Sequence, residues 1–309
     1  GRGPSVWDMY SSVPNTVYNG DTGQVACDHY HRYQSDVALM AHMGLKAYRF
    51  SVSWSRVLPE GKGKVNPAGL DFYSRLVDAL LEKNIRPFVT LYHWDYPLAL
   101  YHQGGWLNRD SADWMADYGQ IVAEKLADRV KDWMTWNEPS IFCMAGHSEG
   151  GLAPGLRLKR PDVLRVAHHI LLAHGKTVQR LRSVANDLRI GIAATGPIGL
   201  PVSDADIEAA RRYTFSDDEP NLWKHNSWAD PAILGYYSPE FSTVEVLMPP
   251  HYQDDLPTIH QKLDFYGLNT YSGDHIRTHE GRPQIVKGAT GHAVTLFHWP
   301  VTPSVLYWG

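Results

Sequence analysis

Short apolar segments alternate with longer amphipathic segments along most of the chain. The apolar segments carry hydrophobic residues on both faces of a pleat and lie at residues 45–54, 85–94, 129–138, 188–196 and 262–271. Strands that are apolar on both faces are typical of a parallel sheet covered by helices. The pattern therefore predicts five buried parallel strands.

Longer segments between these strands repeat their apolar residues at a spacing of three to four, as amphipathic helices do. They cover residues 67–84, 110–128 and 160–183. Strands that alternate with helices favour βαβ units with right-handed crossovers. No change of composition, repeat or low-complexity linker divides the chain. We therefore expect a single domain over residues 1–309, with a loop-and-helix excursion at 197–260.

Composition excludes several classes of protein. The 309 residues are 43% hydrophobic and 20% charged, with a formal net charge of -4. Together with the lack of Lys/Arg-rich blocks, this charge argues against nucleic-acid and anionic-membrane partners. No apolar run reaches the ~18 residues of a membrane span, and the first residues lack a signal-peptide profile. The only cysteines, Cys27 and Cys143, are far apart, so we expect a reduced, cytoplasmic protein.

Polar and aromatic side chains gather where the predicted strands end. In a parallel α/β barrel the active site lies at the C-terminal ends of the strands. The residues at these ends are Arg49, Trp54, His93, Trp94, Asp95, Asn137, Glu138, Asn269 and Tyr271. A structural core has no use for that set of groups, so we expect a functional site there.

Glu138 is the central candidate, because it follows a buried strand and Pro139 forbids continuation of that strand. The ordinary alternative for Glu138 is a solvated loop acid, and for Asn137 a cap or turn residue. As a pair they suit sugar cleavage, which needs a second carboxyl group facing the same bond. The sequence leaves open whether His93 and Trp94 are core residues or part of a functional site. Arg49 lies inside an apolar strand, where a buried guanidinium needs an anion, best an ionised carboxylate.

Other chemistries find less support in the sequence. His29-x-His31 has the spacing of some metal sites, but it precedes a helical pattern rather than ending a strand. His168, His169 and His174 lie in one predicted helix without the HExxH order, so we expect surface or packing histidines. No GxGxxG, P-loop or GxSxG motif occurs. We therefore expect neither a metal nor a cofactor.

Several motifs together resemble glycoside hydrolase family 1, the β-glucosidase type. They are YRFSVSWSRVLPEG, VTLYHWDYPLAL, GGWLNRD, TWNEP, AHHILLAHG and DFYGLNTYSG, and the resemblance extends from residue 1 to residue 309. It implies a (β/α)8 TIM-barrel fold and cofactor-free hydrolysis of β-linked glucosides with retention. The substrate would be a β-glucoside or an oligosaccharide.

The resemblance also implies roles for the acid/base and for the residues that bind the sugar. Glu138 matches the general acid/base that protonates the leaving oxygen and later activates water. Asn137 matches the residue that binds the sugar 2-hydroxyl. His93 and Trp94 match residues around the sugar that precedes the scissile bond, with His93 bonding its hydroxyls.

A second set of roles concerns the nucleophile. Arg49 and Tyr271 match the two groups that hold and tune the nucleophilic carboxylate, and Asn269 matches a polar group beside the acid. The nucleophile itself belongs to an ENG motif on the family's seventh strand, and no ENG occurs here. Neither Glu149 nor Glu280 stands in a matching position.

The chain starts after the family's first strand and stops before its seventh, so we expect an incomplete barrel that lacks strands one, seven and eight. The outer two of the five predicted strands would then be unpaired edges, which favour self-association or a complementing chain. The sequence thus predicts a β-glucosidase-type hydrolase that is weakly active or inactive as an isolated chain. The alternative is a non-catalytic split-barrel fragment that binds sugar or assembles with another chain.

Overall fold

The main sheet of the computed structural model has five parallel strands in the order β1-β2-β3-β4-β6. The model describes residues 1–215, 219–288 and 291–309. The strands are β1 Ala47–Ser51, β2 Arg86–Tyr92, β3 Asp132–Asn137, β4 Arg189–Ala194 and β6 Phe265–Leu268. Each strand pairs in parallel register with the next, as Phe88 with Asp132 and Gly191 with Phe265 illustrate. All five predicted strands form and pair in parallel, with shorter bounds than the apolar runs, but only β2, β3 and β4 are buried as predicted. The outer strands β1 and β6 are partly exposed, because each lies at an edge of the sheet.

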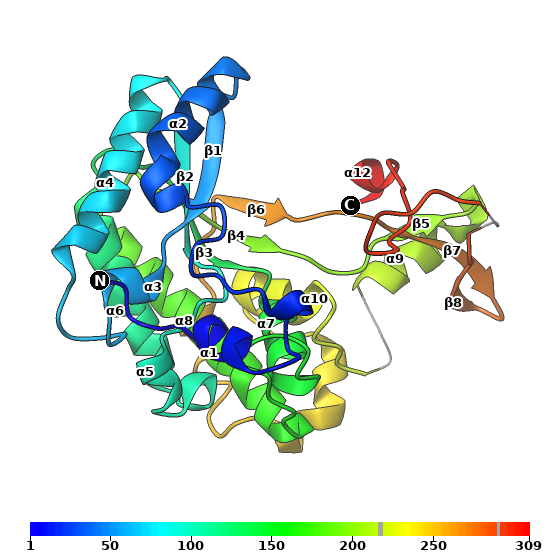
Figure 1. Cartoon of the computed structure of the whole chain (residues 1–309). Coiled ribbons are helices and arrows are strands. Elements are labelled where there is room, and N and C mark those ends of the chain that lie inside the picture. The colour runs from blue at the N-terminus through cyan, green and yellow to red at the C-terminus, as the bar shows by residue number, and fades with distance from the viewer. Residues whose placement is uncertain (216–218, 289–290) are drawn as a thin grey trace.

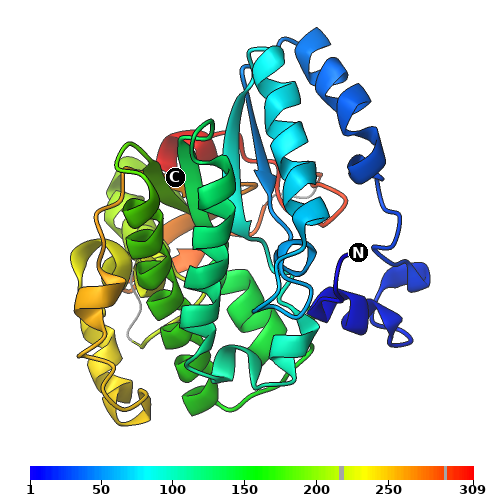
Figure 2. The same ribbon diagram turned by 90° about the vertical axis from the view of Figure 1, so that its left-hand side faces the viewer.

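Four helices connect and cover these strands. They are α2 His29–His42, α4 Pro67–Glu82, α6 Ser111–Leu126 and α8 Arg160–Val184. Figure 2 shows them side by side in front of the sheet. The helices predicted at 67–84, 110–128 and 160–183 are therefore confirmed, because their apolar stripes pack on the sheet and on each other.

Shorter helices fill the connections. The α-helices are α1 Val6–Ser12, α3 Trp54–Val57, α5 Leu98–Tyr101, α7 Pro139–Cys143, α9 Ile207–Phe215, α10 Asn226–Ala229, α11 Leu256–Ile259 and α12 Val305–Trp308. The 3-10 and π turns are η1 Tyr18–Gly20, η2 Gly105–Leu107, η3 Met144–Ser148, η4 Asp204–Asp206, η5 Asp230–Leu234 and η6 Pro239–Leu247. Most of them lie beyond the C-terminal ends of the strands, on the side of the candidate site (Figure 1).

A second, smaller sheet projects from the main one and was not predicted from the sequence. It contains β5 Gly199–Pro201, β7 Asp274–His279 and β8 Arg282–Ile285 in that order, beside α9 and α12 (Figure 1). Strands β7 and β8 form a hairpin whose turn residues Glu280 and Gly281 have φ of 48° and 75°. Two positive φ values in succession give the turn twist that a tight hairpin needs. The stretch expected to hold only loops and helices therefore contains one strand, β5.

The sheet of the (β/α)8 type is not closed within the described residues. Strand β1 pairs with β2 and strand β6 pairs with β4, and these two outer strands do not pair with each other in the part of the chain that the structure describes. The architecture is therefore an incomplete barrel, as the sequence predicts. Its two edges run along β1 and β6 (Figure 1).

Large aromatic residues dominate the core between the sheet and the helices. Trp54, Trp133, Trp136, Trp228 and Tyr118 are among the largest fully buried side chains. Trp54 stacks on Tyr118 with ring centroids 5.0 Å apart. Burial of such residues contributes most of the hydrophobic stabilisation of a domain.

Helix α8 packs unusually closely against α11. A Cβ on Gly175 would lie only 1.9 Å from the backbone oxygen of Thr258, so any other residue would push α11 away. This explains the glycine inside a long helix, where it otherwise weakens the helix by about 1 kcal/mol.

An ion network joins the same two elements. Asp255, just before α11, accepts from the guanidinium of Arg109, one N–H···O distance being 2.6 Å. The Nε2 atom of His168, on α8, lies 2.8 Å from Asp255 Oδ2, the oxygen that also accepts from Arg109 at 2.6 Å, and His168 is fully buried. Burial alone raises the pKa of Asp255, but the hydrogen bonds from His168 and Arg109 outweigh it and hold that pKa well below its usual value. His168 is therefore a packing histidine with an ionic partner.

His174 is a second buried histidine on α8, beneath the strand that carries the candidate acid. Its Nδ1 lies 2.8 Å from the Thr135 hydroxyl oxygen, and its ring packs on Trp136 at 4.5 Å between centroids. Burial lowers the pKa of His174 to about 3. The imidazole is therefore neutral in the folded protein throughout the ordinary pH range.

The His174→Gln variant should show a weaker pH dependence of stability than the wild-type chain. Between pH 6.5 and 5.5 the unfolded chain takes up a proton on His174 that the folded chain refuses. The free energy of unfolding of the wild type therefore falls as the pH falls, and the variant should lose about 1 kcal/mol less between pH 7 and 5.5. Urea denaturation at both pH values measures this difference. Equal losses in the two proteins would contradict a neutral, buried His174.

No helix in the described part of the chain is long and apolar enough to cross a membrane. Both cysteines are free thiols, Cys27 exposed and Cys143 buried.

Candidate active site

Glu138 occupies the first position after β3, where the chain turns from strand to helix. Strand β3 is buried along its whole length, and the Glu138 amide still donates to the Ala193 carbonyl of β4 at 2.7 Å. Glu138 then adopts a left-handed conformation, φ 47° and ψ 66°, and Pro139 begins α7. Non-glycine residues with positive φ are uncommon and cluster at functional sites. This turn places a buried carboxyl group at the C-terminal edge of the sheet.

Residues from the end of β6 hold the Glu138 carboxylate. The Asn269 side-chain amide donates to Glu138 Oε1 at 2.6 Å and to Asn137 Oδ1 at 2.9 Å. The Tyr271 hydroxyl lies 3.5 Å from the same Glu138 oxygen. Backbone pairing fixes this arrangement, because the backbone N–H of Asn269 donates to the Ala194 carbonyl of β4 at 2.8 Å.

Arg49 reaches the same cluster from β1. Its Nε donates to Thr90 Oγ1 at 2.8 Å, and its terminal nitrogens donate to the side-chain oxygens of Asn137 and Asn269. These three partners are neutral oxygens, whereas the sequence leads us to expect a carboxylate. Burial lowers the pKa of Arg49, and the negative charge of Glu138 offsets part of that effect. Arg49 therefore stays a cation with neutral hydrogen-bond partners among the described residues.

His93 and Trp94 come from the loop after β2. Asn137 Nδ2 lies 3.1 Å from His93 Nε2, and the Trp94 indole N–H donates to the Asn137 carbonyl at 2.8 Å. Trp94 has φ 79°, another left-handed residue in the site. Burial lowers the pKa of His93 to about 4, and the Arg49 cation adds to that effect. At neutral pH the neutral imidazole can either donate a hydrogen bond to a hydroxyl group or accept one from it.

All seven residues predicted for the site lie in one hydrogen-bonded cluster, with Asn137 at its centre. They are Arg49, His93, Trp94, Asn137, Glu138, Asn269 and Tyr271. Trp54 and Asp95, which the sequence also places at strand ends, do not belong to this hydrogen-bonded cluster. Trp54 packs in the core, where its indole N–H donates to the Gly61 carbonyl. Burial raises the pKa of Asp95 to about 7, and its carboxyl bonds to the Ser53 side chain.

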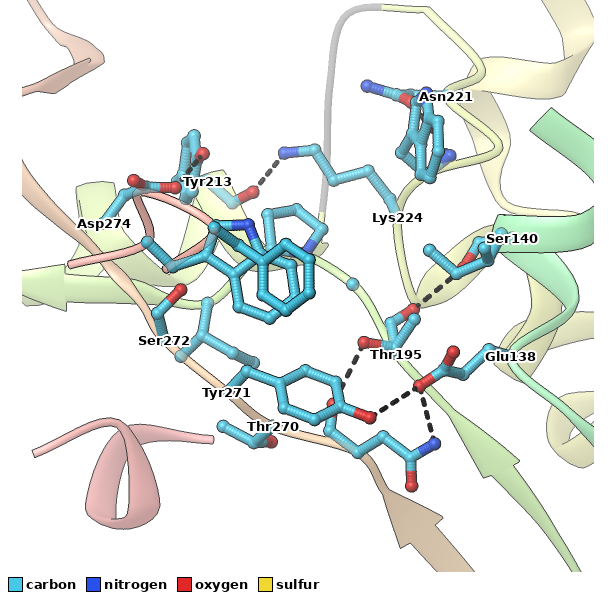
Figure 3. Close-up of a pocket in the computed structure, with 18 of the residues that line it drawn as sticks. Glu138, Ser140, Thr195, Tyr213, Asn221, Lys224, Thr270, Tyr271, Ser272 and Asp274 are labelled. Carbon is cyan, nitrogen blue, oxygen red and sulfur yellow. Dashed lines mark hydrogen bonds between the residues drawn. The ribbon is translucent and has the colours of Figure 1, made fainter. Parts of the chain in front are cut away.

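The Glu138 carboxylate opens into a cavity of about 1010 Å³. Trp94, Asn269 and Tyr271 line it beside Glu138, and Figure 3 shows the Tyr271 hydroxyl pointing at the carboxylate. At its far end the Tyr213 hydroxyl donates to Asp274 at 2.7 Å. A cavity of this size can hold more than a single sugar ring.

Other aromatic residues of this cavity were missed from the sequence. Trp223, Phe297 and Trp299 line it, and the Trp299 ring lies 5.4 Å from that of Tyr271. They lie outside the predicted strand ends, in connections without a periodic pattern. In the sequence, only their indole and phenyl groups could have indicated a role in the site, since flat apolar faces suit sugar rings.

The described residues contain no group of three or more His, Cys, Asp and Glu side chains that could hold a metal ion. His29 and His31 instead contact Asp36 and Asp28, each at 2.6 Å. Glu149 and Glu280 are not among the residues that line the cavity in the described structure.

Comparison with known proteins gives a consistent result. The sequence profile described as Glycosyl hydrolase family 1 matches residues 1–305. The 1,4-beta-D-glucan glucohydrolase of Thermotoga neapolitana is 42% identical over 100% of this chain and 72% of its own length. Beta-glucosidase A of Thermotoga maritima is also 42% identical, over 100% of this chain and 68% of its own length.

Solved structures agree. The Thermotoga maritima beta-glucosidase in complex with castanospermine superimposes with a TM-score of 0.88 at 41% identity, and so does its complex with deoxynojirimycin. Both comparisons cover 100% of this chain and 68% of the solved chain.

Proposed function

This chain belongs to glycosyl hydrolase family 1, as a glycoside hydrolase of the β-glucosidase type, and on that premise we propose that Glu138 is the acid/base that releases terminal β-linked glucose. The observation that carries the proposal is the placement of Glu138. Its buried carboxylate accepts from Asn269 and opens into the sugar-sized cavity. Glu138 would protonate the leaving oxygen and then activate the water that completes the reaction.

The groups around Glu138 suit the recognition of sugar hydroxyls. Asn137 is oriented by Arg49, Trp94 and Asn269, so little freedom is lost when it binds the 2-hydroxyl. His93 is neutral at neutral pH and can bond a neighbouring hydroxyl. We assign Arg49 and Tyr271 to the support of a nucleophilic carboxylate, since a cation and a phenol both stabilise such a group.

Retention of configuration needs a second carboxyl group ~5–5.5 Å from the acid/base. Among the described residues that line the cavity, the acids are Glu138 and Asp274. Figure 3 shows Asp274 at the end of the cavity away from Glu138, where it is bonded to Tyr213. We therefore propose that residues 1–309 alone turn substrate over slowly or not at all.

The open edges along β1 and β6 favour one alternative: a split-barrel piece that binds sugar or pairs with a second copy or a complementing chain. Unpaired backbone groups on an edge strand are a template for such pairing. In that case the purified chain would form assemblies, which light scattering detects. A monodisperse monomer would count against this alternative.

The proposed site is tested by sugar binding, which does not require turnover. Deoxynojirimycin, the ligand of one related structure, should bind the chain, and His93→Ala should weaken that binding about tenfold through loss of a hydrogen bond. Isothermal titration calorimetry measures both affinities. His102→Ala is the matched control, because His102 is exposed and lies outside the cavity-lining set. Equal affinity of wild type and His93→Ala would remove His93 from the site.

A further inference from the structure

Two hydroxyl groups just beyond the strand ends belong to a relay of hydrogen bonds that ends on Glu138. The Ser140 hydroxyl donates to the Thr195 carbonyl at 3.1 Å (Figure 3), and the Thr195 hydroxyl donates to the Asn269 carbonyl at 3.0 Å. The Asn269 side-chain amide in turn donates to Glu138 Oε1 at 2.6 Å. From this geometry we propose that Thr195 and Ser140 are positioning residues, which act through Asn269 to hold the Glu138 carboxylate in place. The proposal rests on the proposed function, because it takes Glu138 as the acid/base.

Thr195 is the first residue after β4, and its hydroxyl prolongs the pairing of β4 with β6. The backbone N–H of Asn269 donates to the Ala194 carbonyl at 2.8 Å. The carbonyl of the same residue accepts from the Thr195 hydroxyl instead of from a backbone N–H. Both backbone groups of Asn269 are therefore bonded to adjacent residues at the end of β4. This double attachment sets the direction in which the Asn269 side chain leaves the sheet.

Ser140 prolongs the pairing of β3 with β4 in the same way, across a strained turn. The Glu138 backbone N–H donates to the Ala193 carbonyl at 2.7 Å, and two residues further on the Ser140 hydroxyl donates to the Thr195 carbonyl. Between these bonds lie Glu138, with φ 47°, and Pro139, which has no backbone N–H to donate. A left-handed residue other than glycine persists only where its surroundings fix it. Ser140, which is 1% exposed, fixes the exit from this turn.

The relay bears on the chemistry because Asn269 contacts two groups of the site at once. Its amide donates to Asn137 Oδ1 at 2.9 Å as well as to Glu138. Thr195 and Ser140 line the cavity, but each O–H donates to a backbone carbonyl, so neither is left to donate to a sugar. In an active site a misplacement of about 1 Å can cost about 10²-fold in rate. The two hydroxyls therefore act on the reaction through the position of Asn269.

Calorimetric titration with deoxynojirimycin tests the relay without a need for turnover. Thr195→Val, which keeps the shape of the side chain and removes the hydroxyl, should weaken binding about tenfold. Thr195→Ser, which keeps the hydroxyl, should stay within about twofold of the wild type. Ser140→Ala should weaken binding about threefold, since it breaks a bond further from Glu138. In chains that carry Asn269→Ala, Thr195→Val should cause no further loss, because a residue that acts through Asn269 then has no side chain to position.

Thr177→Val is the matched control. Thr177 is buried on α8, outside the cavity-lining set, and its hydroxyl has no hydrogen-bond partner within the described residues. This variant should bind as the wild type does, and urea denaturation shows that each variant is folded. Equal affinity of wild type and Thr195→Val, or a tenfold loss that persists in the Asn269→Ala background, would overturn the relay and leave the proposed function intact. A wild-type chain that does not bind deoxynojirimycin would overturn both.

Discussion

The 309-residue chain should hydrolyse an aryl β-glucoside at least about 10³-fold more slowly than beta-glucosidase A of Thermotoga maritima, measured side by side. The reason is chemical: residues that act as a unit are strongly non-additive, so an acid/base without its nucleophile loses most of the acceleration. Within the described cavity, Glu138 faces an amide and a phenol, Asn269 and Tyr271, rather than a second carboxyl group. Release of nitrophenol under saturating substrate measures the rates.

Two variants identify the source of whatever turnover remains. Glu138→Gln should remove residual activity toward a poorly activated leaving group, which needs protonation. Asp274→Asn should leave it unchanged, since Asp274 is engaged by Tyr213 at the other end of the cavity. A rate comparable with the relative's would contradict the proposal. A large loss on Asp274→Asn would then identify Asp274 as the substitute carboxylate. Light scattering on the same sample reports whether active material is monomeric or assembled.

The main sheet could be predicted from the sequence because its strands are apolar on both faces and lie between helices. Strands β7 and β8 could not, since their side chains are mostly polar or exposed. They are held by backbone pairing, by the tight turn at Glu280 and Gly281 and by a few contacts such as buried Ile276. Such a hairpin leaves little hydrophobic periodicity for a sequence-based prediction to find.

The candidate site could be predicted largely because parallel strands end at the same edge. Residues as distant in sequence as Arg49 and Asn269 become hydrogen-bond partners for this reason alone. Two features needed the structure. The contacts of Arg49 are neutral amide and hydroxyl oxygens, which a one-dimensional argument from buried charge does not reveal. Trp299 enters the cavity from a connection after β8, and its position depends on the small sheet that the sequence did not disclose.

The network around Asp255 joins the segment before α6, helix α8 and the start of α11. Asp255 takes hydrogen bonds from Arg109, near the start of α6, and from fully buried His168 on α8. It also precedes α11, whose backbone touches Gly175. Three elements are therefore fixed by one carboxylate. Because its pKa is held below the value in the unfolded chain, the stabilisation is present above about pH 4 and is lost as the pH falls further.

Asp255→Ala should lower the free energy of unfolding at pH 7 by about 3 kcal/mol, the upper range for leaving a buried hydrogen-bonding group without its partner. The loss is large because His168 is left buried without its acceptor, and because α11 loses its tie to α8. Urea denaturation followed by tryptophan fluorescence measures it. Asp254→Ala is the matched control: Asp254 is the neighbouring residue, pairs with His251 at 3.3 Å, and has a side chain 78% exposed. Exposed pairs contribute at most about 1 kcal/mol, so the control should remain close to wild type. If the two variants were equally stable, Asp255 would be a surface ion pair in solution and α11 would be held by its apolar contacts with α8 alone.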